Sequence, residues 1–554
     1  MKRTVIAIGL DAADPSVIEK WMSQGYLKNI RQLRDQGAYG RLKTFDHYRA
    51  ETPWTTFLTG CSPKKTGYWS PIKYYQETYT ADTVQAYDYS HYKPFYAVDS
   101  SKRVAIVDMP HARLCEDLNG VQMMAWGAHS PQGPSESSPA PLFQEMVEQY
   151  GEHPVLRKDG ADTLNIPALK TLLKHLKTGV ERRAQICQDL IQREAWDFFL
   201  TVFGETHSVG HYFWHFSQPD HPWHEEFQAC FDTDPMLEIF EAIDRGIGDI
   251  LAKAPSDAQV VVFAAHGMGA NTMDLPSLVY LPEFMYRFNF PEKRGIAPGT
   301  EGTKVGKYIA DEEAQKNGWA KTVWNLHRDP NLVRRFLRSV LPQRAVNRFA
   351  DYFDSPEGSD LRSPFWLKKH GVPQPFQPAI WYSSMWPQMK AFALPSFSEG
   401  YIRINLKGRE AQGIVDPSEY HAVCDEIITA LQGMKDARTG QPMVERVERT
   451  RQNPLDNDPN LPDADIVVIW QEKTVADAVD IEGLGRIGPV PFLRTGSHRA
   501  DGFIVAKCDG VEAGSSLEQG HSLDLAPTLM HLMDAPLPDY FDGKPLIKTP
   551  VPVA

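Results

Sequence analysis

The strongest constraint on the fold of this chain is an alternation of short, mainly apolar segments with longer segments of helical periodicity. The apolar runs are TVIAIGL at 4–10, DFFLTVF at 197–203 and QVVVFAA at 259–265, and each has the length of a strand covered on both faces. A helical pattern follows the first run and precedes the other two. This alternation predicts an α/β fold with a doubly wound, mostly parallel sheet and helices on both faces.

The first expected helix begins with favourable terminal signals. Asp14 is a good N-cap residue and Pro15 a good first helical residue, and apolar residues then recur at helical spacing. Gly25 is expected to divide this segment into two helices. Further strands of the sheet are expected near 103–107, 401–405, 465–470 and 502–507, and further helices near 163–192, 235–252 and 417–432.

The length of 554 residues exceeds one ordinary core, so we expect a large α/β domain that carries an insertion. Between 285 and 395 the alternation gives way to Pro, Trp, Phe and basic residues with only short helical patches. We therefore expect a catalytic core formed by 1–284 and 396–548. The inserted cap at 285–395 is expected to determine substrate specificity.

One part of the expected cap is strongly basic. The segment NLVRRFLRSVLPQRAVNRF, at 331–349, places arginines on an amphipathic pattern. This pattern is typical of a solvated helical face. It is also consistent with steering of an anionic substrate, or with a membrane-surface or nucleic-acid partner.

The overall charge argues against a nucleic-acid partner. Asp and Glu number 71 against 58 Lys and Arg, so the net charge of −13 repels phosphate backbones. No apolar run approaches the ~20 residues that a bilayer crossing needs, and the apolar part of MKRTVIAIGL is too short for a signal peptide. The six cysteines form no CxxC pair, so we expect reduced thiols in a cytoplasmic protein.

Ionisable side chains lie directly after several expected strands. Ligands bind beyond the carboxyl ends of the strands in doubly wound sheets, so these positions are candidate site residues. They are Asp11, Glu205, His207 and His266, together with His498 in the loop before 502–507. His111 and His129 also lie in loops expected to follow strands, but histidines of this kind are more often structural.

Two patterns among these residues indicate metal binding. His207 and His211 are four residues apart, so one helical turn would place both imidazoles on one face. His266 lies in AAHGMG, where glycine allows the backbone to approach a bound ion closely. The hydroxyls of Thr52 and Thr55, in ETPWTTFLTG, need a metal or a base to act as nucleophiles.

Six segments, in order along the chain, resemble a known family. They are IGLDAADP, ETPWTTFLTGCSPKKTG, GETHSVGHYFWH, FAAHGMG, GSHRADG and DLAPTLMHLM. Their order and spacing resemble the type I phosphodiesterase and nucleotide pyrophosphatase branch of the alkaline phosphatase superfamily, over most of 1–280 and 395–545. The resemblance implies an alkaline-phosphatase-like fold and a two-metal hydrolase of phosphate esters.

The resemblance also implies the metal ligands. Asp11 and His266 would hold the metal that binds the nucleophile, and His211 and His498 would hold the other metal. The metal is expected to be zinc, with manganese or iron as alternatives, and the number of ions is one or two.

Two positions depart from the family pattern. An aspartate of the family is His207 here, so one metal site would contain three imidazoles, those of His207, His211 and His498. Such a set leaves an open position for water or substrate, as catalytic zinc requires. A second aspartate of the family is Ala265 here, so the other site lacks one carboxylate.

The nucleophile and the fate of the lost carboxylate each have alternatives. The resemblance implies Thr52 as the nucleophile, with Thr55 as the alternative. Glu51 or Glu205, both adjacent to matched segments, would replace the lost ligand. If neither glutamate replaces it, either a single metal ion is enough for catalysis or the protein has lost its activity.

We therefore expect a metal-dependent phosphodiesterase or pyrophosphatase that acts on a small anionic phosphate ester. The alternatives are a sulfatase or phosphonate hydrolase on the same fold, and an impaired protein that only binds a phosphate ligand. CSPKK at 61–65 resembles the Cys-x-Pro-x-Arg segment of sulfatases, but Lys65 replaces its arginine.

Overall fold

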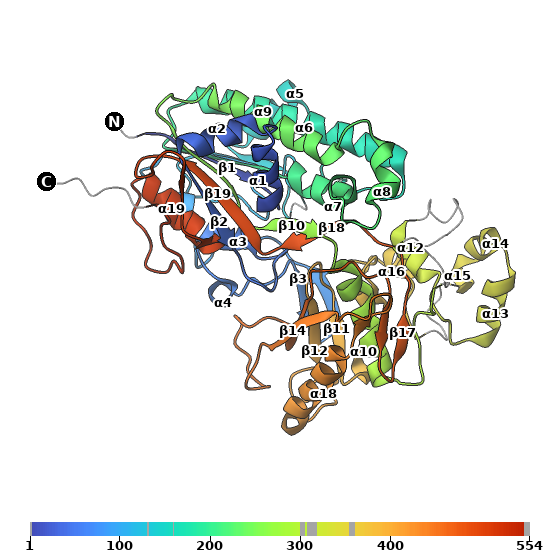
Figure 1. Cartoon of the computed structure of the whole chain (residues 1–554). Helices are drawn as coiled ribbons and strands as arrows, with labels where there is room; N and C mark the ends of the chain where they lie inside the picture. Colours follow the sequence, from blue (N-terminus) through green and yellow to red (C-terminus); the bar gives the residue numbers. More distant parts are fainter. Residues whose placement is uncertain are drawn as a thin grey trace. The chain divides into compact units, whose positions relative to one another are not determined.

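The computed structural model describes residues 3–129, 132–158, 160–299, 305–306, 318–353 and 360–547. The chain divides into two compact units, which we call unit 1 and unit 2 (Figure 1). Unit 1 consists of Met1–Trp69, Gln85–Ala270 and Arg494–Ala554, and unit 2 of Ser70–Val84 and Asn271–Leu493. Unit 2 is therefore much larger than the cap expected at 285–395. Among the described helices none is long and apolar enough to cross a membrane.

The central sheet of unit 1 is mainly parallel. Its middle strands follow the spatial order β9, β1, β8, β5 and β6, and all of these neighbours are parallel. Their bounds are Gln259–Ala264, Val5–Leu10, Phe198–Phe203, Val104–Val107 and Gly120–Met124. At the edges, β19 (Asp501–Lys507) pairs antiparallel with β9 and with β2 (Ala38–Lys43), and β7 (Glu136–Ser138) pairs antiparallel with β6. This sheet confirms the predicted α/β class.

Helices cover both faces of the sheet, as the sequence predicts. One face carries α1 (Pro15–Ser23), α2 (Lys28–Gln36), α6 (Ile166–Arg193) and α9 (Pro235–Leu251). Figure 1 shows α6 and α9 side by side on this face. On the other face, α3 (Pro53–Thr59) and α19 (Leu525–Leu532) share one apolar core cluster with β1 and β8.

The expected start of the first helix is confirmed in detail. The side chain of Asp14 accepts the backbone N–H groups of Ser16 and Val17, which satisfies two of the N–H groups at the start of α1 that lack a partner within the helix. Gly25 has a φ of +84° and ends α1, so the segment divides there into α1 and α2.

Unit 2 has its own antiparallel sheet, in the order β11, β12, β15 and β14. The bounds of these strands are Ala391–Leu394, Gly400–Ile404, Ile466–Trp470 and Val444–Arg449, and α18 (Tyr420–Gln432) contacts β14. The expectation that the strands near 401–405 and 465–470 rejoin the parallel sheet is therefore wrong. An apolar run predicts a buried strand but carries no information about which sheet it joins. The strand near 502–507 does join the central sheet, as β19.

A buried ionic network joins α6 to the ends of three strands. Arg183 of α6 lies 2.7 Å from the carboxylate of Asp108, which follows β5, and 3.2 Å from that of Glu205, which follows β8. His153 lies 3.0 Å from the same Glu205 carboxylate. Asp108 also accepts the backbone N–H groups of Trp126 and Gly127, which follow β6. The network therefore fixes the loops at the carboxyl ends of these strands.

Replacing Arg183 with methionine should destabilise unit 1 strongly. The change leaves the buried carboxylates of Asp108 and Glu205 without their cation, which costs about 3 to 5 kcal/mol of unfolding free energy. Urea denaturation followed by circular dichroism measures the difference. Arg193→Met, which removes a partly exposed ion pair on the same helix, is the matched control and should cost less than about 1 kcal/mol. Equal losses in the two variants would contradict this account.

Candidate metal centre

The carboxyl ends of the parallel strands bring most of the predicted site residues together. Asp11 directly follows β1, and His266 lies two residues after the end of β9. His207 and His211 lie on α7 (Glu205–Ser217), which begins two residues after β8. His498 comes from β18 (Gly496–Arg499), which pairs with β10 (Gly267–Ala270) immediately after His266. The strand-end positions predicted from the sequence thus meet at one edge of the sheet.

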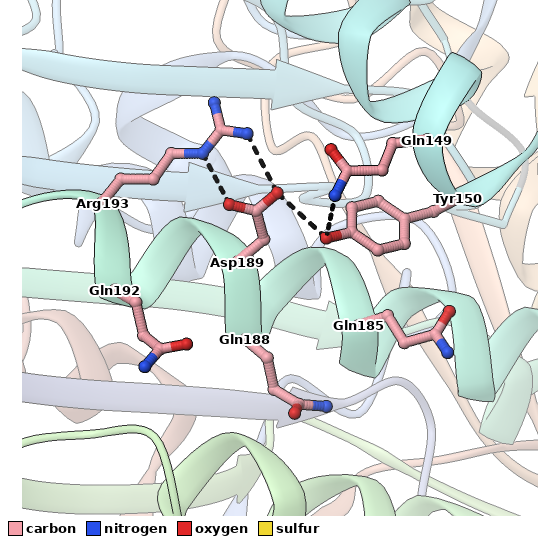
Figure 2. A pocket seen from close by; sticks show the side chains of 7 residues that line it. All are labelled: Gln149, Tyr150, Gln185, Gln188, Asp189, Gln192 and Arg193. Carbon is pink, nitrogen blue, oxygen red and sulfur yellow. Dashed lines mark hydrogen bonds and ion pairs between the residues drawn. The ribbon is translucent and has the colours of Figure 1, made fainter.

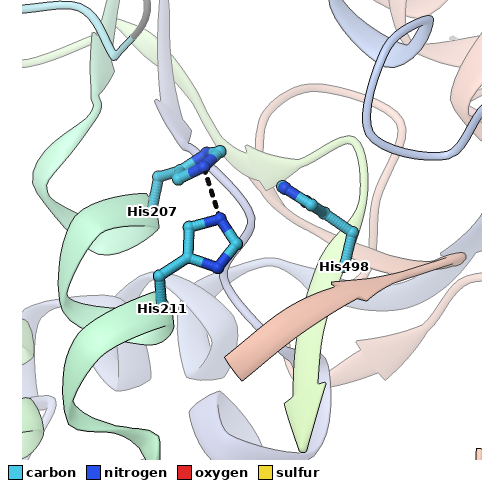
Figure 3. A group of neighbouring side chains, drawn as sticks. All are labelled: His207, His211 and His498. Carbon is cyan, nitrogen blue, oxygen red and sulfur yellow. Dashed lines mark hydrogen bonds between the residues drawn. The ribbon is translucent and has the colours of Figure 1, made fainter. Parts of the chain in front are cut away.

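Three imidazoles form a group suited to one metal ion. His207 and His211 lie one turn apart on α7 and face His498 across a short gap (Figure 3). One nitrogen of each ring lies within 4.8 Å of the others, and all three side chains are buried. Two imidazole nitrogens bound to one tetrahedral zinc ion lie about 3.3 Å apart, so these side chains fit such an ion with small adjustments.

One hydrogen bond and one close contact with a carboxylate orient two of these rings. Nδ1 of His211 lies 2.7 Å from the carbonyl oxygen of Gly496, and Nδ1 of His207 lies 3.2 Å from the carboxylate of Asp11. When each Nδ1 carries the proton for its oxygen partner, each Nε2 presents a lone pair. The two Nε2 atoms lie only 2.8 Å apart. Two facing lone pairs repel each other unless a cation or a proton is present, so this arrangement suits a metal ion.

Arg494 is a residue of this site that the sequence interpretation missed. Its Nη1 lies 2.9 Å from Nε2 of His211, the same nitrogen that faces His207. A guanidinium at this position supplies positive charge to the site, and arginine is well suited to bind the oxygens of a phosphate group. The sequence signal was weak, because Arg494 lies just outside the segment GSHRADG that carries the family resemblance.

A second group of ligands surrounds Asp11. Its carboxylate accepts Nε1–H of Trp54 at 3.0 Å and lies 3.8 Å from Nε2 of His266. Neither ring nitrogen of His266 makes a hydrogen bond within the described part of the chain, although both are buried. Buried polar atoms without partners are rare, so Asp11 and His266 together are suited to hold a second cation. Ala265, where the family has an aspartate, packs into the apolar core cluster.

Two further histidines extend this cluster. The ring of His129 stacks on that of His207, with centroids 3.7 Å apart. His129 and His111 both interact electrostatically with Asp11 and lower its pKa, against the larger effect of burial, which raises it. His129 and His111 follow β6 and β5, so they lie beyond the carboxyl ends of strands, as the other residues of the cluster do.

The candidate nucleophiles differ in their surroundings. The hydroxyl of Thr52, the residue before α3, donates to the carbonyl oxygen of Tyr48 at 2.9 Å. The hydroxyl of Thr55, inside α3, is buried and has no hydrogen-bond partner in the described structure. Both side chains are almost wholly buried.

Glu205 and Glu51, the two carboxylates expected as replacement ligands, make different contacts. Glu205 is bound to Arg183 and His153 in the buried network beneath α7, so it is not a metal ligand in this arrangement. Glu51 is buried beside Thr52, and its carboxylate accepts the N–H of Ala50 at 3.2 Å.

Burial keeps the clustered histidines neutral. It lowers the pKa of His266 and of His111 to about 4, and it holds the pKa values of His211 and His498 well below their ordinary value. Neutral imidazole is the form that binds metal ions. The site is therefore ready to bind a cation at neutral pH.

An open pocket of about 790 Å³ lies elsewhere on unit 1, between α6 and the end of α5 (Pro141–Tyr150) (Figure 2). It is lined by glutamines and by Asp189, whose carboxylate is bound to Arg193 and Tyr150. None of the clustered histidines lines it. Its charged groups are already paired with each other, so the pocket offers no group for catalysis.

Comparisons with known proteins identify the family of the chain. The model of the family described as type I phosphodiesterase / nucleotide pyrophosphatase matches residues 5–289. Phosphonoacetate hydrolase from Sinorhizobium meliloti 1021, in complex with phosphonoformate, is 13% identical over 96% of each chain, with a TM-score of 0.48. Wild-type alkaline phosphatase PafA is 13% identical over 98% of each chain, with a TM-score of 0.47. Neither structural likeness is close enough to carry a conclusion, and no curated protein sequence matches the chain.

The depressed pKa of His266 makes a prediction about the stability of the metal-free protein. The folded pKa of about 4 lies below the ordinary value of 6.5, so the unfolded state binds more protons between these pH values and stability falls as the pH falls through this window. When the pH falls from about 7.5 to about 5, the unfavourable protonation of His266 in the folded state should therefore lower the unfolding free energy by about 2 kcal/mol.

His266→Asn should remove this part of the pH dependence. The measurement is urea denaturation at both pH values in the presence of a chelator, and His91→Asn, at an exposed position, should keep the wild-type dependence. An unchanged dependence in His266→Asn would show that this imidazole titrates normally.

Proposed function

The chain belongs to the type I phosphodiesterase / nucleotide pyrophosphatase family of phosphoester hydrolases, and we propose that it is a metal-dependent phosphodiesterase or pyrophosphatase with a threonine nucleophile. The observation that carries this proposal is the convergence of His207, His211 and His498, with two Nε2 atoms facing each other at 2.8 Å. The arrangement places these imidazoles close enough to share one cation, and Arg494 already supplies a cationic N–H group to Nε2 of His211. A divalent metal, which we propose to be zinc, would be held by these three imidazoles.

Asp11 and His266 would hold a second ion. The aspartate that the family resemblance implies as a further ligand is Ala265 in this chain. A bound ion would supply positive charge that lowers the pKa of a hydroxyl and stabilises the oxygens of an in-line displacement. Asp11 has a further role in this scheme, because its carboxylate also orients His207. One carboxylate thus serves both groups of ligands.

The charge of the cluster favours an anionic substrate. The described cluster combines one carboxylate, that of Asp11, with six histidines and Arg494. Any bound divalent ion therefore leaves a surplus of positive charge, which suits a phosphate diester or pyrophosphate. Arg494 is placed to donate two parallel hydrogen bonds to phosphoryl oxygens.

Thr52 is the proposed nucleophile. Its hydroxyl already donates a hydrogen bond to Tyr48, so the oxygen lone pairs remain available for attack on phosphorus once the pKa of the hydroxyl is lowered. The attack would form a bond between Oγ1 of Thr52 and phosphorus, expel the alcohol or phosphate leaving group with the hydroxyl proton, and leave a threonine-linked diester that keeps the second ester group. Water would then release the phosphate monoester and restore the hydroxyl. Thr55 lies one helical turn further on and is the alternative.

A metal and turnover assay tests the hydrolase proposal. The purified chain should contain at least one divalent ion, measured by plasma mass spectrometry, and should hydrolyse bis(p-nitrophenyl) phosphate. His211→Asn should lose the ion and lower kcat/KM at least about 100-fold, since the residue acts directly on the metal. His91→Asn is the exposed control and should match wild type in both readings.

Two outcomes of this assay would count against the proposal. A folded protein with neither metal nor turnover would be the phosphate-binding protein given above as an alternative. Turnover that a chelator leaves unchanged would exclude the metal-dependent mechanism.

The two threonines can be separated by substitution. Thr52→Ala should lower kcat at least about 1,000-fold, whereas Thr55→Ala should stay within about fivefold of wild type. Thr52→Ser, which keeps the hydroxyl, should recover part of the activity. When the reaction with a substrate radiolabelled at phosphorus is quenched in acid, label should remain covalently bound to wild type and to Thr55→Ala. It should be absent from Thr52→Ala. The reverse pattern would assign the nucleophile to Thr55.

A further inference from the structure

A short helix in unit 2 presents its apolar side chains to solvent. The helix is α13 (Leu332–Val340), and the exposed fractions of Leu332, Val333 and Phe336 are 67%, 63% and 64%. Val340 at its end is 55% exposed. Phe349, which follows α14 (Gln343–Arg348), and Tyr352 of α15 (Ala350–Phe353) are also exposed. We call these six residues the apolar face of α13–α15.

Polar contacts hold this helix with its apolar face outward. Arg334 is buried and lies 2.9 Å from the carboxylate of Asp329. The guanidinium of Arg338 lies over the ring of Phe353, 5.1 Å from its centroid, and Asn331 caps the helix by accepting the N–H groups of Val333 and Arg334. Amphipathic helices of globular proteins normally turn their apolar side inward. Here the charged side is the anchored one, so the exposed face is set by specific contacts.

This orientation changes the interpretation of the basic segment. The sequence pattern was typical of a solvated face that displays arginine, and the structure instead buries Arg334 and displays leucine, valine and phenylalanine. Large exposed apolar side chains gathered on one surface usually mark an interaction site.

The charge around the apolar face points to the kind of partner. Between Asp329 and Asp351 the chain has five arginines and no acidic residue, within a protein whose net charge is −13. Asp329 pairs with the buried Arg334, which adds nothing to the exposed charge, and Asp351 pairs with Lys369. Arg344 and Arg348 are exposed beside Phe349. Exposed apolar residues flanked by arginine are typical of segments that lie in the interface of an anionic membrane, where the apolar side chains enter the headgroup region and the arginines meet lipid phosphates.

We propose that the apolar face of α13–α15 binds the surface of a membrane that contains anionic phospholipid. A second copy of this chain is a poorer occupant, because self-association would bring two arginine-rich surfaces together. The apolar residues supply the buried area, and the arginines select anionic over zwitterionic headgroups. This inference is independent of the proposed hydrolase activity.

Vesicle sedimentation with the full chain tests this proposal. Wild type should bind vesicles of phosphatidylcholine with about 30% phosphatidylglycerol, bind pure phosphatidylcholine vesicles at least about tenfold more weakly, and lose affinity as salt is raised. Val333→Glu/Phe336→Glu should reduce binding to the anionic vesicles at least about tenfold. Arg344→Gln/Arg348→Gln should reduce the preference for anionic vesicles.

Ile414→Glu is the matched control, because Ile414 is an exposed apolar residue of unit 2 at 42% exposure outside the apolar face. It should bind vesicles as wild type does. Circular dichroism and turnover of a soluble diester should match wild type in all variants, which separates loss of binding from loss of folding.

Three results would overturn the proposal. One is a wild-type chain that binds neither vesicle, and another is unchanged binding in Val333→Glu/Phe336→Glu. The last is a wild-type chain that does not bind vesicles but forms a dimer in sedimentation velocity, where Val333→Glu/Phe336→Glu is a monomer. That result would assign the face to a second copy of the chain.

Discussion

The parallel arrangement of five strands is the constraint on which the site depends. Parallel strands end at the same edge, so residues in the segments just after β1, β5, β6, β8 and β9 meet there although they are far apart in sequence. The buried bond between Arg183 and two carboxylates then holds three of these strand ends in place. Because the anchor is ionic and wholly buried, it tolerates the loss of neither partner, and the geometry of the histidines depends on it.

The cluster is unusual in its balance of charge. By the family resemblance His207 and Ala265 stand at positions of aspartate, and Asp11 is the carboxylate that lies close to both His207 and His266. Burial favours the neutral imidazoles, so the protein itself contributes little negative charge to offset a divalent ion. A site of this composition would bind cations less tightly than one rich in carboxylates, and a divalent ion held there would attract phosphate more strongly.

Periodicity predicted the elements of unit 1 well, because buried parallel strands and two-sided helices have distinctive patterns. It could not assign β12 and β15 to their sheet, since an apolar run looks the same in a parallel core and in an antiparallel one. For the site, the spacing of His207 and His211 predicted two imidazoles on one face of a helix, and α7 places them there. Arg494 and the direction of the Glu205 side chain could not be predicted, because each depends on a contact between residues distant in the chain.

The contact between Arg494 and His211 imposes an order of events. One nitrogen cannot accept the guanidinium and coordinate an ion at the same time, so the arginine and the ion are competitors for Nε2 of His211. The guanidinium supplies positive charge and an N–H group to this crowded set of imidazoles. An ion held by His211 would require the guanidinium to move, and its N–H groups would then be available to the oxygens of an ester.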